Sequence, residues 1–159
     1  MKVRLTPELA YIIGLWKTRK TKEGIGVEGG PELLSAFVKG SLDAKLTTSN
    51  KLLTEEDKAY FYHSAYRRFF QEVLERENEA FKHKNEFCAS FLAGLFDSRG
   101  GYSHDGKTVY LSHADKIDEF VVLNAGFKAK LIKNKMIILD KSDFLSFISK
   151  YRKVSVAGE

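Results

Sequence analysis

The chain has 159 residues, of which 43% are hydrophobic and 30% charged, and its formal net charge is +5. These values are typical of a globular protein and suit one compact domain, or two small halves that share a core. One cysteine, Cys88, excludes an internal disulfide, and no apolar run approaches the roughly 18 residues of a membrane helix. Without a signal-peptide pattern, we expect an intracellular protein, cytoplasmic or associated with the nucleoid. The basic excess is compatible with a nucleic-acid partner.

The first half opens with a well-marked helix start. Thr6 suits the N-cap, Pro7 the first helical position, and Glu8 the positive end of the helix dipole. Residues 9–16 are apolar nearly all round, which predicts a helix buried on several sides. The elements predicted after it are a strand over 24–28, a helix over 31–39, strands over 43–48 and 58–63, and a helix over 66–74.

The second half begins in the same way. Asn85 suits an N-cap, residues 87–96 are again apolar all round, and Gly100 ends the helix. The Asp105–Gly106 pair is a hairpin turn signal. The elements predicted around and after it are strands over 102–103 and 107–112, a helix over 116–124, strands over 127–132 and 136–139, and a helix from 142 or 143 to 151.

The two halves repeat one unit. Residues 29–46 align without a gap over residues 114–131, and the helix ahead of each aligns Gly14 with Gly94. A glycine inside a helix costs roughly 1 kcal/mol relative to alanine, so we expect both glycines at a close helix–helix contact. The predicted organisation is an N-terminal copy at 1–76, a linker at 77–85, a C-terminal copy at 86–153 and a tail at 154–159.

The second buried helix carries a recognisable motif. Residues 92–101 read LAGLFDSRGG, and residues 12–20 of the first copy read IIGLWKTRK. Together with the repeated order of elements, these strings resemble the two motifs of single-chain LAGLIDADG homing endonucleases. The resemblance implies an α+β, pseudo-two-fold αββαββα architecture in which two saddle-shaped antiparallel sheets lie on double-stranded DNA. Two copies in one chain also imply a monomer.

A lysine-rich strand supports a nucleic-acid interface. Residues 128–135 contain four lysines and no acid, and alternation along a strand places Lys128 and Lys130 on one face. The repeat alignment makes Lys45 the equivalent of Lys130. The candidate contacts to nucleic acid, counting the ends of both motifs and the predicted turns, are Arg19, Lys20, Lys22, Lys45, Thr47, Arg99, Lys107, Lys128, Lys130, Lys133 and Lys135.

The motifs depart from the family where its chemistry resides. In the family, the acid before the final glycine of each motif binds Mg²⁺ for hydrolysis; here those positions are Arg19 and Arg99. Arginine has five donors, no acceptor and a permanent charge, so it cannot bind Mg²⁺. We therefore expect no catalytic residue, no metal and no cofactor, with Asp97 as the residual acid. The arginines either clamp phosphates or suit the negative ends of the helix dipoles.

The function that follows is binding of double-stranded DNA without cleavage, by a degenerate homing endonuclease. The first alternative is a nuclease that binds Mg²⁺ through displaced acids such as Asp97 and Glu23. The second is a maturase-like protein that binds intron RNA. The third is a protein-interaction module, whose binding would not weaken steeply with salt.

Overall fold

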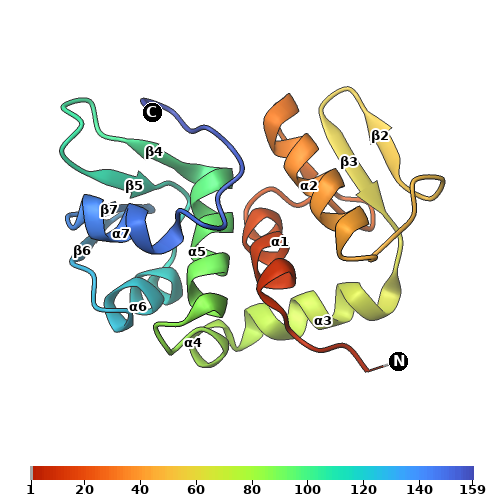
Figure 1. The fold of residues 1–159 in the computed structure, drawn as a ribbon, viewed down its shortest axis with the longest axis horizontal. Helices are drawn as coiled ribbons and strands as arrows, with labels where there is room; N and C mark the ends of the chain where they lie inside the picture. The colour runs from red at the N-terminus through yellow and green to blue at the C-terminus, as the bar shows by residue number, and fades with distance from the viewer. Residues whose placement is uncertain (1) are drawn as a thin grey trace.

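The computed structural model describes residues 2–159 and places two buried helices side by side at its centre (Figure 1). They are α1 (Pro7–Lys17) and α5 (Glu86–Arg99). The side chain of Thr6 accepts a hydrogen bond from the Leu9 amide, and that of Asn85 accepts two from the first turn of α5. Both predicted N-caps are therefore confirmed.

The N-terminal half is built on a small antiparallel sheet in the order β1-β3-β2. An isolated bridge between Lys20 and Val27 continues this sheet beyond β1. The helix α2 packs against β1 and β3. The elements of this half after α1 are β1 (Ile25–Glu28), α2 (Pro31–Asp43), β2 (Leu53–Glu55), β3 (Lys58–Phe61), α3 (Ser64–Glu75) and α4 (Glu77–Ala80).

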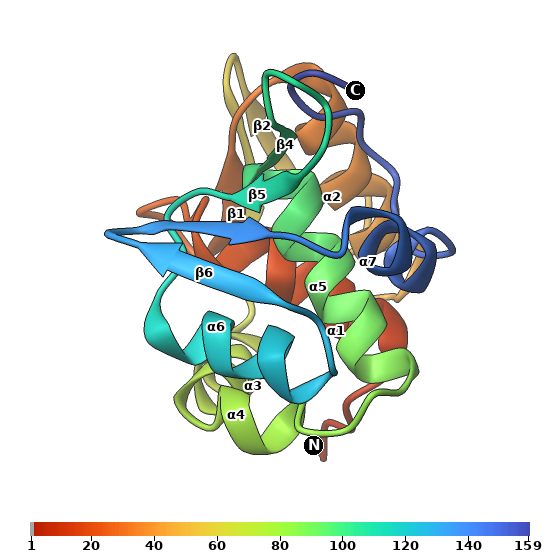
Figure 2. The ribbon, with the colours of Figure 1, turned by 90° about the vertical axis from the view of Figure 1, so that its left-hand side faces the viewer.

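The C-terminal half has the same arrangement with a complete first hairpin. Its antiparallel sheet has the order β4-β5-β7-β6, which matches the order Lys20-β1-β3-β2 of the first half. Figure 2 shows α5, α6 and α7 gathered on one side of this sheet. The elements after α5 are β4 (Gly100–Tyr102), β5 (Val109–Leu111), α6 (Lys116–Asn124), β6 (Ala129–Ile132), β7 (Lys135–Ile138) and α7 (Lys141–Ile148).

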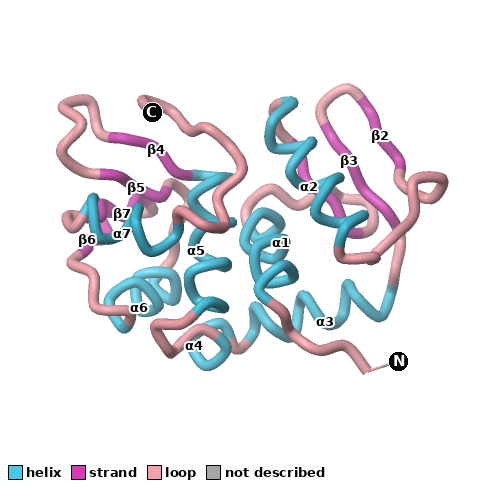
Figure 3. Tube along the Cα trace, viewed as in Figure 1, coloured by secondary structure: helices cyan, strands magenta, loops and turns pink. Residues whose placement is uncertain are grey.

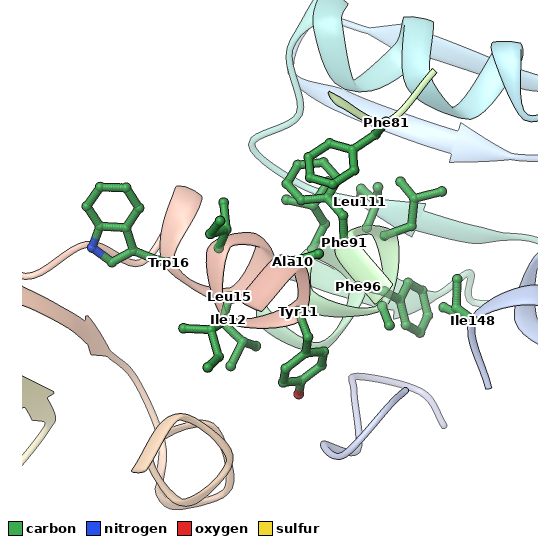
Figure 4. Close-up of a cluster of buried hydrophobic side chains, with 14 of the residues drawn as sticks. Ala10, Tyr11, Ile12, Leu15, Trp16, Phe81, Phe91, Phe96, Leu111 and Ile148 are labelled. Atoms are coloured by element: carbon green, nitrogen blue, oxygen red, sulfur yellow. The ribbon is translucent and has the colours of Figure 1, made fainter. Parts of the chain in front are cut away.

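The core surrounds the two central helices. Every residue of α1 from Leu9 to Trp16 is buried, as is every residue of α5 from Cys88 to Ser98. Figure 4 shows their aromatic and aliphatic side chains packed into both halves, with Phe81 stacked on Phe91. A helix that is apolar all round needs such cover on every side, which is why one continuous core joins the halves. None of the helices within residues 2–159 has the length and apolarity needed to span a bilayer.

One predicted strand is wrong. Residues 43–48 do not form a strand, because α2 continues to Asp43 and Lys45 then adopts a left-handed φ of 59°. At the end of α6, Gly126 takes the same role with a φ of 95°. Since α2 has 13 residues and α6 has nine, Lys45 corresponds to Gly126 and not to Lys130. The ungapped alignment of residues 29–46 with residues 114–131 therefore does not hold to the ends of α2 and α6.

Candidate nucleic-acid interface

The two motif helices touch through their glycines. A Cβ on Gly14 would collide with the Phe91 carbonyl oxygen and would lie 3.0 Å from the Gly94 Cα. A Cβ on Gly94 would collide with the Tyr11 carbonyl oxygen. Only a residue without a side chain fits either position, so this contact fixes where the C-terminal ends of α1 and α5 meet.

The two motif arginines cross between the helices. Arg19 donates from Nε to the Ser98 carbonyl at 3.1 Å, and Arg99 donates from Nη2 to the Thr18 carbonyl at 2.8 Å. Arg99 Nε also lies 3.4 Å from Thr18 Oγ1. Each guanidinium thus satisfies a carbonyl in the last turn of the opposite helix, where carbonyls lack intrahelical partners and the dipole is negative. Both side chains remain partly exposed.

Asp97 fixes the C-terminal tail. Its carboxylate accepts hydrogen bonds from Tyr11 Oη at 2.6 Å, Arg152 Nε at 3.0 Å, and the amides of Lys153 and Val154 at 2.7 and 3.2 Å. Burial raises the pKa of the Asp97 carboxyl, and these donors act against that shift. Beyond this anchor the tail runs past the end of α5 as a loop (Figure 3) and forms a parallel bridge with β4.

Lys17 occupies the position in α1 that Asp97 has in α5, and its environment is reversed in charge. Its ammonium lies 2.6 Å from Glu77 Oε1, 2.7 Å from Asp118 Oδ1 and 3.0 Å from Asp115 Oδ2. Glu77 and Asp118 are only 1% and 2% exposed. Burial, followed by the nearby Asp118, raises the pKa of Glu77 to about 9, while the acids raise the pKa of Lys17. The three carboxyl groups are close enough to hold a metal ion, but the Lys17 ammonium binds all three.

A cavity of about 450 Å³ opens beside the crossed arginines. A second space, next to Thr18, Arg99 and Asp118, measures only about 10 Å³. The main lining residues of the larger cavity come from the motif ends, the start of α2, the strand β5 and the tail, and they are Arg19, Gly30, Pro31, Glu32, Leu33, Asp97, Ser98, Arg99, Tyr110, Ser112 and residues 154–157.

The outer face of the β4–β7 sheet is basic. Along β6 the burial alternates, with Ala129 and Leu131 turned inward and Lys130 exposed. Lys130 pairs with Ile137, which pairs in turn with Tyr110, so these side chains form a row across the outer face. The exposed lysines that share this face or its turn, named here the basic face, are Lys128, Lys130, Lys133 and Lys135.

No acid lies within ion-pair distance of these four lysines among residues 2–159. Lys135 instead places its ammonium 4.3 Å from the centroid of the Tyr110 ring. The outer face of the β1–β3 sheet differs, because Lys58 is paired there with Glu23 at 2.6 Å and with Glu55 at 3.3 Å. The halves share a fold, but their outer faces differ in charge.

The other candidate contacts are dispersed. Lys20 is exposed at the isolated bridge with its ammonium 4.2 Å from the Trp16 ring centroid, and Lys22 is exposed in the following turn. Lys107 is exposed in the β4–β5 turn. Lys45 and Thr47 lie in the α2–β2 connection and not on a strand, so the structure does not bring them to the outer face of a sheet.

Several residues of the site escaped the sequence analysis. Arg152 and Glu77 have no motif around them, the local role of Asp118 is that of a helix-capping acid, and Tyr110 was not singled out. One signal was present: a lysine at the end of an all-apolar helix needs buried acids to pair with it.

Comparison with solved structures identifies the class of fold. Mesophilic variants of the homing endonuclease I-DmoI match with a TM-score of 0.61 and 13% identity, covering 94% of this chain and 98% of theirs. I-DmoI in complex with DNA and Ca matches with a TM-score of 0.60 and 14% identity, covering 91% and 88%. The N-terminal LAGLIDADG domain of DUF199/WhiA matches with a TM-score of 0.59 and 15% identity, covering 94% and 86%.

The chain therefore has the α+β fold of the LAGLIDADG homing endonucleases, with its two antiparallel sheets. No protein-family model matches its sequence, and no curated protein sequence does so either. Identities of 13–15% identify the fold alone, so function has to be argued from the site.

Proposed function

We propose that this protein binds double-stranded DNA without cleaving it. The observation that carries the proposal is the basic face: four exposed lysines on the outer face of one sheet and its turn, with no acid within ion-pair distance among residues 2–159. Phosphates attract such a surface regardless of sequence, and base edges are read from within the groove. I-DmoI, a structural neighbour, was solved in complex with DNA, which supports the same use of the fold here.

The C-terminal half provides most of the phosphate contacts in this proposal. Its outer face is basic, whereas Lys58 in the other half is already neutralised by Glu23 and Glu55. We expect the two half-sites of the DNA to contribute unequally to affinity, although the protein is pseudo-symmetric. A single chain with both copies also needs no second subunit to span the site, so we propose a monomer.

The motif ends support binding without two-metal hydrolysis. Arg19 and Arg99 are cations at the centre of the pseudo-two-fold, where they repel Mg²⁺ and offer it no ligand. The displaced acids are already occupied: Asp97 has four hydrogen-bond donors, and Glu23 is paired with Lys58. Each of these carboxylates therefore already has a cationic side chain as its partner.

The test is a selection of bound DNA from a randomised duplex pool, with Mg²⁺ present and strand breaks monitored. Enrichment of one site without breaks supports the proposal, whereas enrichment with cutting shows that other acids hold a metal. Structured intron RNA as a competitor distinguishes the maturase-like alternative, because it would displace the duplex. Absence of binding at low salt refutes nucleic-acid binding.

Two matched variants locate the interface. Lys130→Glu/Lys135→Glu changes the basic face, and Lys39→Glu/Lys150→Glu makes the same charge change at exposed lysines of α2 and beyond α7, on the helical side. Each lost phosphate contact lowers the slope of log K against log salt by about 0.9. We expect a decrease of about 1.8 in the first variant and little change in the second; equal effects would contradict the assignment.

A further inference from the structure

The crossed arginines have more donors than the protein uses. Within residues 2–159 the Arg19 side chain makes one hydrogen bond, through Nε, and the Arg99 side chain uses Nε and Nη2. A guanidinium has five N–H donors. Neither arginine has an acid within ion-pair distance in the same range of residues. Two partly buried cations thus meet at the pseudo-two-fold without a counter-ion.

Like charges held this close oppose one another. Burial lowers the pKa of the Arg99 guanidinium, and the positive charge of Arg19 lowers it further. The hydrogen bonds to Ser98 and Thr18 orient the two side chains, but carbonyl oxygens carry only partial charge. An anion that contacts both guanidiniums would remove this repulsion and use the free donors.

The acids that line the cavity do not serve as that anion. Asp97 is engaged with Arg152, Tyr11 and the tail amides. Glu32, in the first turn of α2, is exposed and forms no ion pair among residues 2–159. The cavity of about 450 Å³ next to the arginines is large enough for a phosphate group.

We propose that Arg19 and Arg99 together bind one phosphate group at the mouth of this cavity. Planar guanidinium forks match the oxygens of phosphate and hold it through paired, charge-assisted hydrogen bonds. Tyr110 and Ser112 line the cavity, and Tyr110 also lies on the basic face, so the mouth continues into the proposed DNA surface. The assignment to a backbone phosphate rests on the proposed function, whereas the phosphate site itself does not.

The position of this site has a mechanistic meaning. The ends of the two motif helices meet at the pseudo-two-fold of this chain, and there it offers two cations where the sequence resemblance led us to expect two acids. A phosphate group bound by the arginines is held by donors alone, with no metal bridge and no base to activate water. The same geometry that excludes Mg²⁺ therefore provides a direct contact to the backbone.

The first experiment follows the arginine Nε–H signals of the unchanged protein by NMR during titration with inorganic phosphate, against sodium chloride at equal ionic strength. We expect saturable shifts of the Arg19 and Arg99 signals with phosphate, and none for Arg68, which is exposed on α3. A short duplex is then titrated in the same way. Absence of a saturable shift with both phosphate and duplex would overturn the proposal.

The second experiment compares Arg19→Gln/Arg99→Gln with Arg68→Gln/Arg76→Gln, two exposed arginines that do not line the cavity. Glutamine keeps an amide donor for the opposite helix carbonyl but removes the charge. We expect the first variant to lose about tenfold in duplex affinity and about 0.9 in salt slope, as for one phosphate contact. Duplex binding like that of the control variant would overturn the proposal.

The two experiments separate this proposal from the proposed function. If phosphate shifts the arginine signals but no duplex binds, the phosphate site stands, the DNA-binding function fails, and a mononucleotide titration identifies a free ligand as the source. If a duplex binds and shifts both arginine signals, the source is the nucleic-acid backbone.

Discussion

Lys17 neutralises a cluster of buried acids, so Lys17→Met tests how much this cluster contributes to the stability of the fold. Its ammonium contacts Glu77 and Asp118, both almost fully buried, and Asp115. Methionine fills most of the same volume but leaves the carboxyl groups without a counter-charge. Removing one partner of a buried ion pair costs about 3–5 kcal/mol. In a chain of this size that lowers Tm by about 6–20 °C.

The loss of folding stability in Lys17→Met increases as the pH rises. Glu77 has a pKa of about 9 in the folded protein against 4.5 in an ordinary environment. A carboxyl whose folded pKa is raised stabilises the fold below its ordinary pKa, and that contribution is lost as pH rises through the folded value. Without Lys17 the pKa of Glu77 rises further, because the ammonium no longer favours the ionised carboxylate. The variant is therefore less stable than the unchanged protein, and the part of this loss that comes from Glu77 grows as pH rises through about 9.

The assay is urea unfolding followed by circular dichroism at pH 8 and at pH 10, on either side of the folded pKa of Glu77. Adding Glu77→Gln to Lys17→Met removes one of the buried acids and is expected to restore part of the stability at pH 10. Lys82→Met is the matched control, since Lys82 forms an exposed ion pair with Glu79 that contributes at most about 1 kcal/mol. Equal stability of Lys17→Met and the unchanged protein at pH 8, or a deficit independent of pH, would refute the reasoning.

Three further predictions concern the motif helices, the tail and metal. Gly94→Ala destabilises the fold by about 1–3 kcal/mol through overpacking, whereas Gly40→Ala, whose Cβ meets side-chain atoms only at 3.5 Å, is neutral or stabilising; chemical denaturation compares the two. Asp97→Asn weakens the ion pair with Arg152, so faster amide hydrogen exchange at Val154 is expected, with exchange in α3 as the internal control. Mg²⁺ or Mn²⁺ at millimolar concentration leaves Tm unchanged, and a dose-dependent rise would reveal a metal site.

Elements that depend on local signals were predictable. The caps at Thr6 and Asn85 act within a few residues, and the helix over 116–124 was predicted with its observed bounds because Asp115 forms a capping box with Asp118. The strand predicted over 43–48 was wrong because this segment depends on a backbone conformation that its residue types do not indicate. A lysine in the left-handed conformation at Lys45 carries no sequence signal comparable to the glycine at Gly126.

By itself, the sequence determined the repeat, the two all-apolar helices, the loss of acids at both motif ends and the lysine-rich strand, since each is a matter of residue type and short-range spacing. The tertiary structure decided what the charged residues do. Arg19 reaches Ser98 in the other copy, and Lys17 meets Asp118 about 100 residues further along the chain. Such pairings depend on how two helices pack at their glycines, and packing over that separation leaves no local pattern to read.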